Sequence, residues 1–262
     1  MNSVNQTLYI PLYGKALVSR KGILLSDPWA ENIWSAAAFP LKGKSKSKWL
    51  AYYMAMRAVV FDRWVAKRMD ENPDATVLHL GCGLDSRVLR VGTHGHRWYD
   101  VDFPDVILAR KRFFEESDTY TMLGADICGD GWLSEISGNR AIVILEGVSM
   151  YLTREALHGL LANLRQRFDT VELLMDCYTE LAARVSKLRN PVHDVGVAQV
   201  YGLDEPRELE SAGMEFVDSH PMTPPDLIEE LQGAEKVIFR KLYAGKTAGK
   251  LYRIYEYRSH RP

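Results

Sequence analysis

Apolar residues fall into two patterns along this chain, and their order predicts an α/β fold. Residues 1–75 show mainly helical spacing, whereas from residue 76 short apolar runs typical of buried strands alternate with helical stretches. Residues 211–220 and 250–258 alternate between apolar and polar positions, as antiparallel strands do. We therefore expect a helical cap over residues 1–75. Over residues 76–262 we expect a mostly parallel sheet ending in an antiparallel hairpin, and the two parts should form one compact unit.

The strand, turn and helix around which the fold is organised span Thr76 to Arg90, with the sequence TVLHLGCGLDSRVLR. A short apolar run ends in a glycine turn and resumes with helical spacing, which is the first βα unit of a nucleotide-type fold. Gly81 and Gly83 let the backbone turn tightly and let a ligand approach without a Cβ in the way. The start of the following helix presents free N–H groups to whatever binds there.

Asp85 follows this turn about where a dinucleotide-binding fingerprint would have a third glycine. A carboxylate at a helix N-terminus repels a pyrophosphate but suits a ligand with a positively charged end. S-adenosylmethionine is such a ligand, because it carries a sulfonium and an ammonium group and no phosphate. The alternative is a glycine turn of some other α/β domain, in which Asp85 only caps the helix.

A long helix from about Lys48 to Met69 is expected to carry an arginine within its apolar stripe. Arg57 lies one turn from Tyr53 and one turn from Phe61. Burial of a guanidinium is costly unless it meets an anion, so Arg57 either pairs with an internal carboxylate or holds the carboxylate of a ligand. The other charges of this helix are expected nearer its opposite face or its C-terminal end: Asp62, Arg63, Lys67 and Arg68.

The predicted strand at residues 96–104 ends in two aspartates. Asp102 lies about 20 positions after Gly81, which is close to the spacing at which an acidic residue accepts the hydroxyls of a bound ribose. Asp100 competes for this role, and either aspartate could instead cap the next helix.

The next two predicted strands, at residues 120–127 and 141–153, also carry a carboxylate at or near their ends. Asp126 could accept a hydrogen bond from an adenine amino group while Ile127 donates its backbone N–H. Glu146 stands at the carboxyl edge, where open α/β sheets bind their ligands. Carboxylates at successive strand ends beside a glycine loop predict one ligand site.

The composition argues against several classes of protein. Lys and Arg total 33 against 34 for Asp and Glu, a net charge of -1, so no basic face for nucleic acid is expected. Three cysteines without a CxxC pair argue against a disulfide framework or a metal site. With neither a signal-peptide pattern nor a membrane-length apolar run, we expect a cytoplasmic protein that does not enter a membrane. Residues 41–48, LKGKSKSK, predict a solvated mobile loop or a lid over the site.

The motifs DPWA, AMRAVVFDRWV, HLGCGLDSR, YDVDFP, GADI and EGVSMYL occur in this order, followed by GLDEPRELESAGMEFV. In this ordered set the chain resembles the leucine carboxyl methyltransferase family, and within it bacterial O-methyltransferases similar to those of polyketide biosynthesis. The resemblance implies a class I (Rossmann-like) methyltransferase fold. It also implies S-adenosylmethionine as methyl donor and S-adenosylhomocysteine as product.

The resemblance also implies how the donor is held. Arg57 and Gly81 would hold the methionine part and Asp102 the ribose. Asp126 and Ile127 would hold the adenine, and Glu146 would line the site near the donor. The expected donor site then comprises Arg57, Gly81, Cys82, Gly83, Asp85, Asp102, Phe103, Asp126, Ile127 and Glu146.

The acceptor is less defined by the sequence. The chain does not match the residues by which phosphatase-modifying members of the family hold a C-terminal leucine carboxylate, so a small-molecule acceptor is preferred to a protein. The methylated group is expected to be a carboxylate, or a phenolic hydroxyl that would benefit from a general base. Candidates for catalytic or acceptor-lining residues are Tyr151, Tyr178, Tyr201 and His193; the alternatives are core positions for the tyrosines and a surface position for the histidine.

Three other functions remain open at this point. One is a protein C-terminal carboxyl methyltransferase. The second is a nicotinamide-dependent oxidoreductase, which Asp85 in place of a third glycine disfavours. The third is a fold relative that binds S-adenosylmethionine as a regulator without turnover, because strand-end carboxylates describe donor binding and not chemistry.

Overall fold

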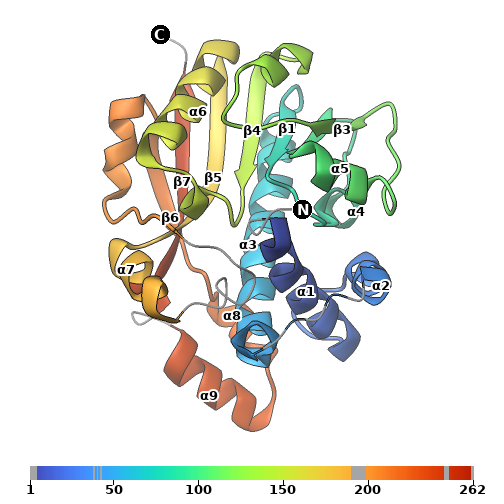
Figure 1. Ribbon diagram of the computed structural model, residues 1–262, viewed down its shortest axis with the longest axis vertical. Helices are drawn as coiled ribbons and strands as arrows, with labels where there is room; N and C mark the ends of the chain where they lie inside the picture. The colour runs from blue at the N-terminus through green and yellow to red at the C-terminus, as the bar shows by residue number, and fades with distance from the viewer. Residues whose placement is uncertain are drawn as a thin grey trace.

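The computed structural model describes residues 5–37, 39, 41, 43–189, 199–244 and 248–260. Within this part of the chain, the centre is a seven-stranded sheet in the order β3-β2-β1-β4-β5-β7-β6 (Figure 1). Strands from β3 to β5 pair in parallel, and β7 is antiparallel to both β5 and β6, which confirms the mostly parallel sheet with an antiparallel C-terminal part. The strands are β1 Thr76–Leu80, β2 Trp98–Asp102, β3 Tyr120–Gly124, β4 Arg140–Leu145, β5 Thr170–Tyr178, β6 Glu215–His220 and β7 Tyr252–His260.

The inner strands are buried on both faces of the sheet. All five residues of β1 are buried, as its apolar run predicts. β2 differs from the alternating pattern expected for residues 96–104, since Trp98 to Val101 are all buried. A strand inside a parallel sheet meets packed side chains on both sides, so even its polar residues must be buried and paired.

Helices cover the sheet, and the segment before β1 is mainly helical, as its spacing predicts. The α-helices are α1 Tyr9–Lys21, α2 Pro28–Ala37, α3 Lys48–Glu71, α4 Arg87–Val91, α5 Pro104–Arg110, α6 Arg154–Arg167, α7 Glu180–Arg189, α8 Pro225–Glu229 and α9 Gly233–Tyr243. Short 3-10 helices include η1 Asn5–Leu8, η2 Gly43–Lys46 and η4 Ser149–Tyr151. Asp27 accepts the N–H of Ala30 at the start of α2, and Thr153 accepts that of Ala156 at the start of α6, which are the hydrogen bonds of helix N-caps.

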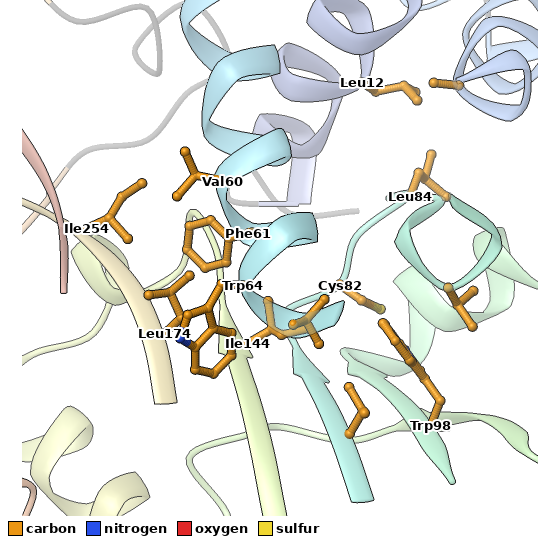
Figure 2. Packing of buried hydrophobic residues seen from close by; sticks show 14 of the residues in the cluster. Leu12, Val60, Phe61, Trp64, Cys82, Leu84, Trp98, Ile144, Leu174 and Ile254 are labelled. Carbon is orange, nitrogen blue, oxygen red and sulfur yellow. The ribbon is translucent and has the colours of Figure 1, made fainter. Parts of the chain in front are cut away.

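The long helix α3 packs across one face of the sheet. Figure 2 shows Phe61 and Trp64 of α3 lying against Leu174 of β5 and Ile144 of β4, in one buried cluster. Alternate residues of the same strands point to the other face, where they form a second buried cluster with α6. The face of α6 that contacts the sheet carries Leu157, Leu160, Leu161 and Leu164, and Phe168 follows just past the end of the helix.

A third buried cluster joins α8 and α9 to α1 and to the side of α3 that carries Tyr52 and Met56. α8 and α9 are two separate helices, and α9 projects at the lower end of the molecule in Figure 1. None of the helices in the described ranges is long and apolar enough to cross a membrane.

Candidate active site

A cavity of about 480 Å³ lies at the carboxyl ends of β1, β2 and β4, and residues of α1 and α3 complete its wall. This is the edge at which open α/β sheets bind ligands. Every residue predicted for the donor site lines this one cavity: Arg57, Gly81, Cys82, Gly83, Asp85, Asp102, Phe103, Asp126, Ile127 and Glu146.

The glycine turn after β1 has a backbone that requires glycine. Gly81 and Gly83 have φ angles of 65° and 53°, in the left-handed region that side chains with a Cβ disfavour. A Cβ on Gly81 would also lie 2.4 Å from Cγ2 of Val148. The turn therefore keeps the backbone open to the cavity.

The two candidate aspartates of β2 have different surroundings. Asp102 lines the cavity, and its carboxylate accepts the N–H of Gly83 and that of Phe103, both at 2.7 Å. Burial raises its pKa despite these hydrogen bonds. Asp100 lies beneath the cavity, fully buried, with Arg110 and Tyr120 as partners. Asp102 is therefore the aspartate of β2 that is available to a ligand.

Asp126 and Ile127 lie together at the end of the cavity beyond β3. Asp126 is exposed and accepts the N–H of Cys128 at 2.9 Å, so its carboxylate is fixed at the cavity wall, whereas Ile127 is buried. An acidic acceptor beside a buried apolar residue is an arrangement that can receive the edge and the face of a heteroaromatic ring.

Arg57 pairs with internal carboxylates, the first of the two alternatives expected for it. Its Nη1 donates to Asp176 of β5 at 2.7 Å and to the hydroxyl of Tyr252 at 2.7 Å, and its Nε lies 3.0 Å from Oε1 of Glu146. The guanidinium is buried yet still lines the cavity. Within the described residues Nη2 donates no hydrogen bond, so ion pairing does not use the whole group.

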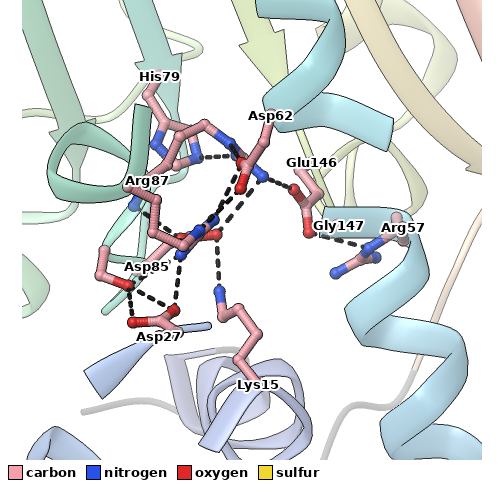
Figure 3. A network of polar contacts seen from close by, with 12 residues as sticks. Lys15, Asp27, Arg57, Asp62, His79, Asp85, Arg87, Glu146 and Gly147 are labelled. Carbon is pink, nitrogen blue, oxygen red and sulfur yellow. Dashed lines mark hydrogen bonds and ion pairs between the residues drawn. The ribbon is translucent and has the colours of Figure 1, made fainter. Parts of the chain in front are cut away.

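Asp85 lines the cavity, and its carboxylate is already paired with cations of the chain itself. It pairs with Lys15 of α1 at 2.7 Å and with Arg90 of α4 at 2.9 Å, and it accepts the N–H of Arg87 (Figure 3). Burial would raise the pKa of Asp85, but Arg90 and Lys15 hold it well below its usual range. The N-cap residue of α4 is Ser86, so Asp85 fixes the start of this helix through the N–H of Arg87 without being its cap.

Glu146 lies between two arginines. Arg87 binds one of its oxygens and Arg57 the other (Figure 3). Burial opposes ionisation, yet the two guanidinium groups lower the pKa of Glu146 to about 2. Glu146 is thus an ionised, fixed part of the cavity wall and is not a base awaiting a proton.

Asp62 also differs from its expected position. It pairs with Arg87 at 2.6 Å and with Arg90 at 2.7 Å, so it faces α4 and does not lie on an outer face of α3. Arg68 lies in the last turn of α3, as expected, and is mostly buried against Glu172 and Glu256 of the sheet. Periodicity missed the position of Asp62 because its ion-pair partners lie on another element, α4.

The acceptor candidates lie in two different cavities, and one candidate belongs to a segment outside the described residues. Tyr151 and Tyr178 line the same cavity as the donor residues. Tyr201 lines a separate cavity of about 300 Å³ beside α6 and α7, so it does not belong to the site. His193 lies outside the described residues.

Several residues of the site were missed by sequence reasoning, among them Lys15, Asp62, Arg87, Asp176 and Tyr252. A signal existed for Asp176, because it ends the mostly apolar run VELLMD, as Glu146 follows another apolar run. No comparable signal existed for Lys15, whose neighbours in the sequence show no motif for a site.

The parallel sheet with an antiparallel strand β7, and a cavity at its carboxyl edge, is the class I methyltransferase fold. Solved structures share this fold. The magnesium protoporphyrin IX methyltransferase of Synechocystis PCC 6803 with bound S-adenosylhomocysteine has a TM-score of 0.53 at 12% identity, covering 87% of this chain and 93% of that one. N-methyltransferase NodS of Bradyrhizobium japonicum, with the same ligand, has a TM-score of 0.53 at 11% identity, covering 89% and 99%.

The chain belongs to the leucine carboxyl methyltransferase family, whose model matches residues 6–165. It is 30% identical over 241 residues to the tetracenomycin polyketide synthesis O-methyltransferase TcmP of Streptomyces glaucescens, covering 90% of this chain and 89% of the relative. It is also 30% identical over 184 residues to the S-adenosyl-L-methionine-dependent methyltransferase dpfgK of Gibberella zeae, covering 64% and 62%. The protein is therefore an S-adenosylmethionine-dependent methyltransferase. This result confirms the resemblance and argues against an oxidoreductase or a binding protein without turnover.

Proposed function

We propose that the protein transfers a methyl group to a carboxylate oxygen of a small, largely apolar molecule of the polyketide type. The observation that carries this proposal is the chemistry of the cavity wall. The part of the wall away from the donor residues is apolar and aromatic, which suits an apolar acceptor. The described residues there offer no unpaired basic side chain, which favours a carboxylate, because a phenol would benefit from a general base. The similarity to TcmP, a polyketide synthesis O-methyltransferase, supports the same class of acceptor.

The cavity fits the donor on this chain's own residues. Each oxygen of the Asp102 carboxylate accepts one backbone N–H and has a further lone pair for a ribose hydroxyl. Asp126 and the backbone of Ile127 would hold the adenine. Nη2 of Arg57 and the backbone of the glycine turn would hold the methionine part. Gly147, with a φ of 72°, supports this arrangement because a Cβ there would lie 3.3 Å from Nη1 of Arg57.

The acceptor half of the wall comes from both parts of the chain. Side chains of residues 1–75 contribute to it, which supports their description as a cap over the sheet. The other contributions come from η4 and from the ends of β5 and β7. The acceptor-side residues are Leu8, Leu50, Tyr53, Met150, Tyr151, Tyr178 and Tyr252. Rings of this kind favour a flat apolar acceptor.

S-adenosylmethionine, when bound, supplies an electrophilic methyl group on a sulfonium. A carboxylic acid with an ordinary pKa of ~4 is already ionised at neutral pH, so the chain does not need a base to prepare it. Burial raises the pKa of Tyr53 and that of Tyr151, so both phenols are hydrogen-bond donors and not bases at neutral pH. What the chain contributes is alignment and exclusion of water, a term of about 7–11 kcal/mol for well-oriented reactants.

The test is transfer of a labelled methyl group to a panel of aromatic carboxylic acids, the corresponding phenols, and a peptide ending in leucine. We expect a product formed from the acids that releases methanol in mild base, as a methyl ester does. A base-stable product formed from the phenols would contradict the carboxylate assignment. Labelling of the peptide in preference to the small acids would support a protein carboxyl methyltransferase instead.

A further inference from the structure

Tyr252 lines the cavity but lies outside residues 6–165 that match the family model. We propose that Tyr252 is a positioning residue for donor binding. Its hydroxyl holds the guanidinium of Arg57 in the orientation that receives the carboxylate of the donor's methionine part. This inference rests on the proposed donor role of Arg57.

The hydroxyl of Tyr252 completes a closed set of hydrogen bonds. It accepts from Nη1 of Arg57 at 2.7 Å and donates to Oδ2 of Asp176 at 2.6 Å, while Nη1 also donates to Oδ2 at 2.7 Å. The three side chains come from β7, α3 and β5, and each is at most 7% exposed. Burial raises the pKa of the Tyr252 phenol, so it remains protonated and able to donate.

These contacts determine which guanidinium nitrogen remains for a ligand. An arginine side chain has much rotamer freedom, and ordering it costs up to about 2 kcal/mol. Nη1 is fixed by Asp176 and Tyr252, and Nε faces Glu146 at 3.0 Å. Since the guanidinium is planar, fixing these two nitrogens also fixes the direction of Nη2. Several rotamers of Arg57 could pair with the carboxylate of Asp176 alone. The additional hydrogen bond to the hydroxyl of Tyr252 selects one of them.

The ring of Tyr252 is itself held in place. It packs edge-on against Tyr178 with ring centroids 5.0 Å apart and against Tyr53 at 6.2 Å. The hydroxyl therefore stands at a fixed point in the wall. Tyr252→Phe keeps these ring contacts and removes only the hydroxyl, which makes it the informative change.

Comparing the binding of two ligands distinguishes a loss of Arg57 positioning from a general effect on the fold. S-adenosylhomocysteine carries the amino-acid carboxylate, whereas 5′-methylthioadenosine carries the nucleoside and sulfur without it. Affinity for both is measured by calorimetry on the full chain. The control is Tyr257→Phe, a change on the same strand but away from the cavity. It removes a buried hydroxyl that donates a hydrogen bond of 3.0 Å to the carbonyl of Pro206.

We expect Tyr252→Phe to bind S-adenosylhomocysteine about tenfold more weakly, because a hydrogen bond to a charged group is lost. Its affinity for 5′-methylthioadenosine should equal that of the unaltered protein. Tyr257→Phe should bind both ligands normally. Unchanged binding of S-adenosylhomocysteine by Tyr252→Phe, or an equal loss for both ligands, overturns the inference.

Arg57→Ala shows which of the two proposals has failed. If Arg57→Ala weakens the binding of S-adenosylhomocysteine and Tyr252→Phe does not, the donor role of Arg57 stands and the positioning role of Tyr252 is wrong. If Arg57→Ala binds S-adenosylhomocysteine normally, the donor role of Arg57 is itself wrong, and the inference is overturned with it.

Discussion

The carboxylate of Asp102 accepts the backbone N–H of Gly83 at 2.7 Å, so the acid at the end of β2 and the glycine loop after β1 hold one another in place. Asp102→Asn should weaken the binding of S-adenosylhomocysteine about tenfold. The asparagine amide accepts fewer hydrogen bonds than the carboxylate, and its NH₂ group would face a backbone N–H that also donates. Calorimetry measures the loss. Asp100→Asn is the matched control two residues away, and it should affect unfolding more than ligand affinity. The reverse result would assign the ligand contact to Asp100.

Replacement of Arg57 should affect stability as well as affinity. Arg57→Ala removes the shared cation of two buried carboxylates, Glu146 and Asp176, and breaking a buried pair costs about 3–5 kcal/mol. This differs from the expectation for an arginine that only holds a ligand, whose loss would leave the free energy of unfolding nearly unchanged. Urea unfolding measures the difference. A loss below about 1 kcal/mol would mean that the ion pairs contribute little.

Gly81→Ala should be more damaging than an alanine at an equivalent backbone position elsewhere. Gly22 has the same φ of 65° but no atom within 4 Å of its added Cβ, whereas the Cβ on Gly81 would lie 2.4 Å from Val148. Gly22→Ala should cost about 1–2 kcal/mol from the left-handed backbone alone. Gly81→Ala should cost a further 1–3 kcal/mol or so from overpacking, and it should lower affinity for S-adenosylhomocysteine. Equal costs in urea unfolding would mean that Val148 moves aside freely.

Asp100 should make stability depend on pH in acid. Burial opposes its ionisation, but Arg110, His79 and Tyr120 lower its pKa from 3.8 to about 2. The folded state then holds the proton less tightly than the unfolded state. A contribution of roughly 2 kcal/mol is therefore present above pH ~4 and is lost as the pH falls toward ~2. Urea unfolding between pH 5 and pH 3 should show a shallower decline for Asp100→Asn than for the unaltered protein; parallel declines would exclude Asp100 as the source.

The sequence was sufficient for those parts of the site that follow from local order along the chain. Gly81 and Gly83 directly follow a strand, and Asp102 and Glu146 stand at strand ends, so one rule about parallel sheets brings them to one edge. The helical spacing of apolar residues in α3 likewise placed Arg57 on the buried face, because this pattern too is local in the chain.

The partners of Arg57 could not be read from the sequence. Asp176 and Tyr252 lie 119 and 195 residues away from it in the chain, and they meet it only because β7 pairs with β5 in a register that places Tyr252 opposite Tyr178. Lys15 and Asp62 were missed for a related reason. Their charges face a partner on another element, so each resembles an ordinary solvent-exposed residue until the fold brings the carboxylate or guanidinium to it.

The place of β7 has a consequence for the order in which the protein becomes competent. β7 follows β6 in the chain yet lies between β5 and β6 in the sheet. A nascent chain that has emerged only as far as α9 therefore has the glycine loop and Asp102, but it has an unpaired edge on β5 and nothing opposite Tyr178. An unpaired strand edge invites association with other chains. Ligand competence and protection from aggregation should thus arrive together, with the insertion of one strand.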